Sequence, residues 1–184
     1  QHHKILWVQW VDSYLGDSLM DLSSRILLEE REIDLLTQEN TAKIYQNDLI
    51  FNQVFVNPNQ CDKDYDLIII GSYRQRELKI LPKHILLTPH VSIYGYYNVD
   101  DFNRLYFSFF RINQLLSYAF NEKFIYDNAC PMLPISDKDR RKVDSCNLPK
   151  EFLVVAVGGA NIERTFNAWD EVVSEIIDKK LFKN

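Results

Sequence analysis

The sequence has few cysteines, no long apolar run and none of the common catalytic motifs. Its cysteines, Cys61, Cys130 and Cys146, are an odd number, and their spacings match neither a metal site nor a disulfide framework. We expect reduced thiols in a cytoplasmic protein. No apolar stretch approaches the roughly 20 residues that cross a bilayer, and 5–11 is too short for a secretory signal. GxSxG, HExxH, Walker and CxxC motifs are absent as well.

The chain also lacks an excess of positive charge. Its net charge is −5, with 21 basic and 26 acidic residues, which argues against a dedicated nucleic-acid-binding protein. With 184 residues, 46% of them hydrophobic, it can bury a core and form one or two domains. The leading Gln1-His2-His3 is typical of a purification-tag remnant, so we leave it out of any metal-site argument.

Strand and helix patterns alternate along most of the chain, which predicts an α/β fold: a Rossmann-like parallel sheet with flanking helices. The strands are expected at 4–11, 33–36, 53–56, 66–71 and 91–97, and the helices at about 17–30, 40–46 and 100–120, the last capped by Asp100. This first domain spans 4–130, and a Pro-bounded, charged linker with one short helix follows at 131–150. The segment 151–184 then reads as a strand at 152–157 and a helix at 168–179, the opening βα unit of a second, incomplete domain.

Asp17 is the leading candidate for chemistry. It follows the first strand and the segment Ser13–Gly16, in the crevice where open α/β sheets bind ligands. Gly16 permits a tight turn and the close approach of a ligand. Asp17 could simply cap the helix that follows, or it could accept a proton from an attacking hydroxyl.

A second candidate site is the small-residue loop Gly158-Gly159-Ala160-Asn161 after the strand at 152–157. Its backbone N–H groups could meet a phosphate, with Arg164 as a bidentate partner, although a plain tight turn and a solvated arginine fit equally well. Arg74 and Arg76, after the strand at 66–71, could hold an anionic substrate or lie in a solvated loop.

These features together resemble glycosyltransferase family 9, the ADP-heptose:lipopolysaccharide heptosyltransferases. Lys4-Ile5-Leu6 and Ser13-Tyr14-Leu15-Gly16-Asp17 are similar to the N-terminal signature of the family, and 155–169 is similar to the start of its donor domain. The resemblance extends in order over nearly the whole chain. It implies a GT-B architecture, in which two Rossmann-like domains face each other across a cleft.

The resemblance also implies roles for individual residues. Asp17 would deprotonate an acceptor hydroxyl, with Ser13, Gly16, Arg74 and Arg76 toward the acceptor. Gly159, Ala160 and Arg164 would contact the donor diphosphate, so neither a metal nor a cofactor is expected. The partners would be a nucleotide-sugar such as ADP-heptose and a lipopolysaccharide-type acceptor. A lipid-linked acceptor would bring a cytoplasmic enzyme into peripheral contact with the inner membrane.

Two departures and two alternatives accompany this interpretation. The family often has Lys where this chain has Arg164, and the rest of a donor domain does not follow Asn184, so we expect the chain alone to be inactive. One alternative is a relative of the family that glycosylates a protein or another glycan. The other is a noncatalytic flavodoxin-like binding domain in which Asp17 is an ordinary cap.

Overall fold

The computed structural model describes residues 3–10, 14–61, 64–71, 76–93, 103–122, 129–150, 152–156 and 166–179. The chain divides into two compact units, residues 1–140 and residues 141–184.

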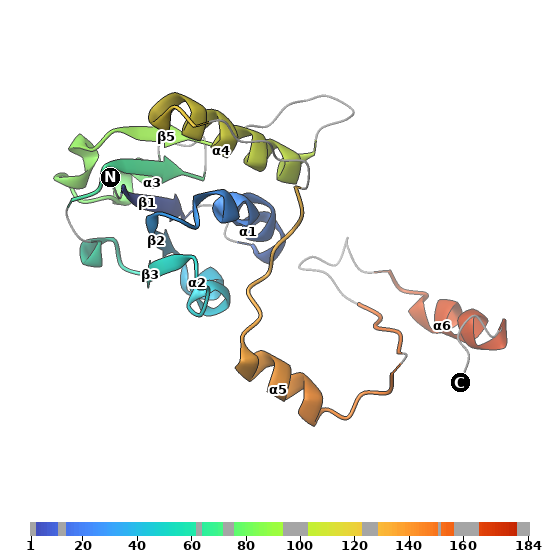
Figure 1. Ribbon diagram of the computed structural model, residues 1–184. Helices are drawn as coiled ribbons and strands as arrows, with labels where there is room; N and C mark the ends of the chain where they lie inside the picture. Colours follow the sequence, from blue (N-terminus) through green and yellow to red (C-terminus); the bar gives the residue numbers. More distant parts are fainter. Residues whose placement is uncertain are drawn as a thin grey trace. The chain divides into compact units, whose positions relative to one another are not determined.

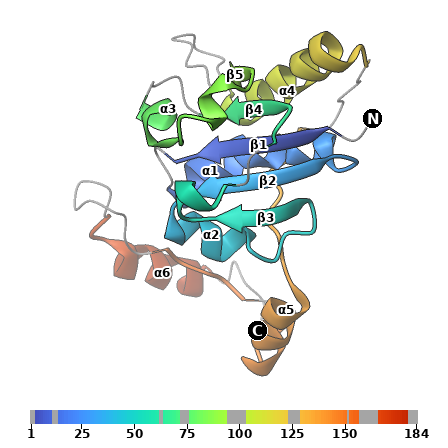
Figure 2. The ribbon, with the colours of Figure 1, turned by 90° about the vertical axis from the view of Figure 1, so that its left-hand side faces the viewer.

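The first unit is built on a five-stranded sheet whose described strand pairs are all parallel (Figure 2). The strands are β1 (Lys4–Gln9), β2 (Glu32–Thr37), β3 (Phe51–Phe55), β4 (Leu67–Ile70) and β5 (His90–Ser92). Their order is β3-β2-β1-β4-β5, so β1 lies at the centre. Apolar runs such as Ile5–Val8 in β1 suit strands that are covered on both faces. The predicted α/β fold with a parallel sheet is confirmed.

Helical segments cover both faces of this sheet (Figure 1). The helices are α1 (Leu15–Leu22), α2 (Glu39–Tyr45), α3 (Arg76–Ile80) and α4 (Arg104–Phe120), and the 3-10 segments are η1 (Ser23–Leu28), η2 (Pro58–Gln60) and η3 (Ile85–Leu87). The alternation of side chains along β1 separates two cores. Ile5 and Trp7 pack with residues of η1 and α4, whereas Leu6 and Val8 pack with Leu81 and Ile85 on the other face.

The ends of α4 are set by two asparagines. The Asn103 side chain accepts a hydrogen bond from the Tyr106 N–H at 3.0 Å and caps the N-terminus. Asn121 ends the helix in the left-handed region, with φ 54°. The prediction that Asp100 caps this helix is wrong, because the helix begins at Arg104 and Asn103 supplies the capping oxygen.

The helix expected over 17–30 is shorter than predicted, since α1 gives way to η1 at Ser23. Arg25 in η1 is 2% exposed, and its Nε donates to Asp48 Oδ2 at 2.7 Å. Its Nη1 also donates to the Met132 carbonyl at 3.1 Å, while the Met132 N–H donates to Ser23 Oγ at 2.8 Å. Both backbone groups of Met132 are therefore held by side chains of η1.

The second unit contains less regular structure. Helix α5 (Asp137–Ser145) crosses the boundary between the units, and α6 (Trp169–Asp178) lies within the second. Residues 152–156 form no strand, contrary to the predicted strand at 152–157, because no described segment pairs with their backbone. None of the described residues of this unit is buried. No helix in the described part of the chain combines the length and the apolar character needed to cross a membrane.

Candidate functional site

The strand order creates a switch point at the carboxyl ends of β1 and β4. From β1 the chain adds β2 and β3 on one side and β4 and β5 on the other, so the connections diverge between β1 and β4. Ligands of open α/β sheets bind in the crevice at such a point. Gln9 ends β1 here, and Gly71 follows β4 with its N–H donating to the Val8 carbonyl at 2.8 Å.

Because Gly71 has no side chain, the Gln9 side chain can occupy the space beside it. A Cβ on Gly71 would lie 1.6 Å from Gln9 Oε1, so any side chain there would displace the amide. Gln9 is 1% exposed, and its Nε2 donates to Asp21 Oδ2 at 3.1 Å. Its carbonyl accepts from Thr37 Oγ1 at 2.7 Å. The end of β1 is therefore fixed by side chains from α1 and β2.

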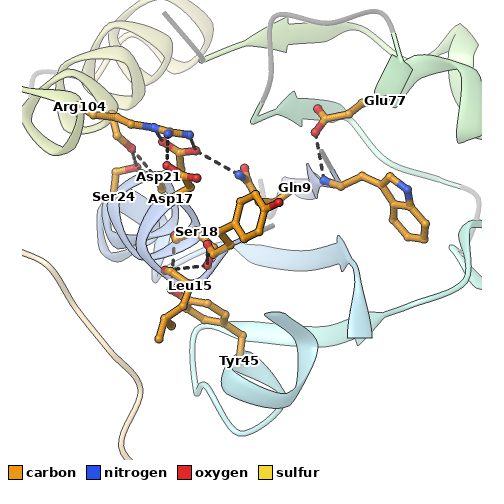
Figure 3. Close-up of polar contacts among 12 residues, drawn as sticks. Gln9, Leu15, Asp17, Ser18, Asp21, Ser24, Tyr45, Glu77 and Arg104 are labelled. Atoms are coloured by element: carbon orange, nitrogen blue, oxygen red, sulfur yellow. Dashed lines mark hydrogen bonds and ion pairs between the residues drawn. The ribbon is translucent and has the colours of Figure 1, made fainter. Parts of the chain in front are cut away.

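Two carboxylates of α1 share one arginine of α4 (Figure 3). Asp17 and Asp21 are four residues apart, so both project from one face of the helix. Arg104 holds Asp21 with two nitrogens, Nε to Oδ1 at 2.8 Å and Nη2 to Oδ2 at 2.6 Å. Its third nitrogen, Nη1, donates to Asp17 Oδ1. This bidentate geometry is the strongest form of arginine–carboxylate pairing.

The two carboxylates differ in their exposure to solvent. Burial raises the pKa of Asp21, and the hydrogen bonds and charge of Arg104 offset part of that effect. The Asp17 side chain is 30% exposed, against 7% for Asp21. No hydrogen bond from a described residue reaches the second oxygen of Asp17, Oδ2. The cluster of two acids and one base carries a net charge of −1 when both acids are ionised.

This arrangement corrects the simplest interpretation of Asp17. Helix α1 begins at Leu15, and its N-cap residue is Tyr14, which makes no side-chain capping bond. Asp17 therefore lies inside the first turn, where its charge is favourable to the helix dipole, and it does not cap the helix. Its main partner, Arg104, lies 87 residues away in sequence.

The remaining predicted residues fall into two groups. Gly16 is the second residue of α1, and a Cβ added to it would meet nothing within 4 Å. The space beside Gly16 is therefore open. Arg76 begins α3, and its side chain lies outside the described part of the structure. The same holds for all atoms of Ser13, Arg74, Gly159, Ala160 and Arg164.

Sequence reasoning missed three residues of this cluster: Gln9, Asp21 and Arg104. The spacing of Asp17 and Asp21 was a visible signal, because residues four apart share a helix face. Nothing local indicates that Arg104 would meet them.

A large cavity lies at the opposite edge of the sheet. It measures about 590 Å³ and is lined by residues that include His3, before β1, and Phe120, at the end of α4. Arg31 and Glu122 form an ion pair at 2.5 Å there, and the Arg31 guanidinium lies 4.8 Å from the centre of the Phe120 ring. These contacts join the end of α4 to the start of β2 and serve packing.

The fold and the switch-point site define this unit as a Rossmann-like α/β domain, and two solved structures are similar to the chain. One is the glycosyl transferase family 9 protein from Veillonella parvula DSM 2008, with a TM-score of 0.66 and 14% sequence identity, covering 97% of this chain and 60% of that one. The other is the E. coli heptosyltransferase WaaC with ADP, with a TM-score of 0.56 and 13% identity, covering 96% and 65%.

The chain thus has the fold of these glycosyltransferases, as its resemblance to family 9 led us to expect. It spans 60% and 65% of the length of the two structures. A scan of protein-family models and a search of curated proteins gave no match.

Proposed function

We propose that the chain is part of a glycosyltransferase that transfers a sugar with inversion, with Asp17 as the general base. The observation that carries this proposal is the position of Asp17 at the switch point, where Arg104 holds one carboxylate oxygen and no described residue bonds the other. A partly exposed carboxylate held in place by one of its oxygens is what a base for a hydroxyl proton requires. The fold shared with two glycosyltransferases supports the reaction class.

In the proposed reaction the proton of an acceptor hydroxyl passes to Asp17 Oδ2. The acceptor oxygen then forms a bond to the anomeric carbon of the donor sugar, while the bond from that carbon to the diphosphate oxygen breaks. The nucleoside diphosphate leaves with the electron pair. Arg104 would hold the Asp17 carboxylate in place during the transfer, and release of the proton to solvent would complete the cycle.

We further propose the division of labour that the family resemblance implies. The segment 4–130 would bind the acceptor through Ser13, Gly16, Arg74 and Arg76, 131–150 would be the linker, and 151–184 would begin the donor-binding domain. Gly159, Ala160 and Arg164 would contact the diphosphate of a nucleotide-sugar such as ADP-heptose, with no metal or cofactor. A lipopolysaccharide-type acceptor would place the enzyme in the cytoplasm, in peripheral contact with the inner membrane.

The test is Asp17→Asn in the intact protein, assayed for sugar transfer from ADP-heptose and other nucleotide-sugars to lipopolysaccharide core acceptors. Asparagine can still accept from Arg104, so the fold should persist while turnover falls by about 10²–10⁴-fold. Asp170→Asn is the matched control, because Asp170 also lies in the first turn of a helix, α6, where it is exposed. Turnover of Asp17→Asn equal to that of Asp170→Asn would reject Asp17 as the base.

A further inference from the structure

A second cavity lies at the same edge of the sheet as Asp17. It measures about 370 Å³ and is lined by Trp10, Gln38, Glu39, Asn40 and Val56. Trp10 follows β1, Gln38 follows β2 and Val56 follows β3, so the cavity spans the carboxyl ends of three neighbouring parallel strands. Its volume falls within the roughly 300–1,000 Å³ of small-molecule sites.

The main chain of Trp10 is held by two side chains. Its backbone N–H donates to Glu77 Oε1 at 3.0 Å, and its backbone carbonyl accepts from Gln38 Nε2 at 2.9 Å. The indole is half-buried against the core cluster that contains Leu36, with Phe55 packed on the same cluster. Because the indole already packs on this cluster, it loses less conformational entropy when a ligand covers it than a fully exposed ring would.

The lining has the chemistry of a sugar site. An aromatic ring offers a flat apolar surface for the C–H face of a pyranose, and the Gln38 and Asn40 amides and the Glu39 carboxylate are groups that bond hydroxyls. Its described residues include one acid and no base, so a carboxylate or phosphate on the ligand would meet uncompensated negative charge. The lining therefore favours an uncharged sugar over an anionic one.

We propose that this cavity binds a neutral sugar residue, stacked on Trp10. That the sugar belongs to the acceptor glycan rests on the proposed function; that the cavity takes a neutral sugar rests on its own lining. The proposal separates two parts of the substrate: Asp17 would act on the reacting hydroxyl, and the Trp10 cavity would hold another sugar of the same glycan.

The experiment follows the indole N–H resonances of the 184-residue chain by NMR. Trp7, Trp10 and Trp169 give three signals, and Trp10→Phe identifies that of Trp10. The probes are methyl glycosides of glucose, galactose and mannose, with glucuronate as the anionic counterpart. At least one neutral glycoside should shift the Trp10 signal saturably with millimolar affinity and leave Trp7, which is fully buried, unmoved. Glucuronate should bind more weakly.

Two variants make the result decisive. Trp10→Ala, read by competition or calorimetry, should weaken the glycoside by about tenfold or more. Glu39→Lys replaces the acid of the described lining by a base and should reverse the preference toward glucuronate. Tyr118→Ala is the control, because Tyr118 is an aromatic residue that lines the cavity at the opposite edge of the sheet.

The proposal is overturned if no neutral glycoside moves the Trp10 signal at up to ~50 mM, since weaker binding would carry no useful affinity. It also fails if glucuronate binds as well as the neutral probes, or if Tyr118→Ala weakens binding as much as Trp10→Ala. The readout needs no turnover. Loss of the Trp10 site and failure of Asp17 as the base are therefore separate results.

Discussion

Replacement of Arg104 by methionine removes the positive charge that two carboxylates of α1 share. Arg104 makes three contacts with them, two to Asp21 and one to Asp17. Breaking a buried pair by removing one partner costs about 3–5 kcal/mol of unfolding free energy. Because Arg104 is 18% exposed and Asp17 30% exposed, solvent compensates part of the loss. We expect a destabilisation of about 2–3 kcal/mol near pH 7.5.

The loss should depend on pH with a defined sign. Burial already raises the pKa of Asp21 in the folded protein, and removing Arg104 removes the contacts that lower it. A raised folded pKa means that the folded state binds the proton more tightly than the unfolded state does. The stabilising contribution of that proton is complete below the unfolded pKa and is lost as pH rises through the folded pKa. The deficit of Arg104→Met should therefore shrink from pH 7.5 to pH 5, by about 1.4 kcal/mol for each unit by which the folded pKa of Asp21 rises within that pH range.

The assay is urea unfolding followed by circular dichroism at both pH values. Arg111→Met is the matched control, because Arg111 lies on the same helix and donates only to neutral oxygens, of Gln114 and of the Ser92 carbonyl, in its described hydrogen bonds. The control should lose about 1 kcal/mol at either pH. The reasoning is refuted if Arg104→Met is no less stable than Arg111→Met at pH 7.5, or if its deficit is unchanged at pH 5.

Two further outcomes concern buried groups. Gly71→Ala places a Cβ 1.6 Å from Gln9 Oε1, so it should lower the free energy of unfolding by about 1–3 kcal/mol in thermal unfolding. Adding Gln9→Ala should recover part of that loss. Equal stability of Gly71→Ala and the wild type would contradict the close packing of Gln9 on Gly71. Burial raises the pKa of Cys61 to about 12. Iodoacetamide at pH 8 should therefore label the exposed Cys130 and Cys146 and spare Cys61, which mass spectrometry can count. Rapid labelling of Cys61 in the folded protein would contradict its burial.

The sheet was predictable because the sequences of its central strands are continuous runs of apolar residues. Ile5–Val8 and Ile68–Ile70 are buried on both faces, and such short runs between helical patterns are typical of a parallel sheet. Element ends were less predictable, since tertiary contacts decide them. The turn from α1 into η1 accompanies the buried pairing of Arg25 with Asp48, which no local pattern shows.

The place of Asp17 after the first strand was predictable, but its partners were not. The strand–turn–helix pattern identified Asp17, because ligands bind where such units meet. The prediction treated Asp17 as either a cap or a free base, whereas the structure pairs it with Arg104 from α4. That contact depends on how α4 packs against α1 across 87 residues of chain, so only the folded backbone reveals it. The prediction of a strand at 152–157 was wrong for a related reason. A strand forms only where a neighbouring strand pairs with its backbone, and the composition of a segment does not show whether one is present.

The attachment of Met132 to η1 bears on how this chain could be recombined with others. Both backbone groups of Met132 bond side chains of the first unit, Ser23 and Arg25, so the first unit includes the chain up to that residue. A chimera joined before Met132 would leave the Arg25 and Ser23 side chains without these partners unless the graft restored them. A junction after Arg140, at the unit boundary among the exposed residues of α5, keeps the first unit whole and makes the chain beyond the junction an exchangeable module.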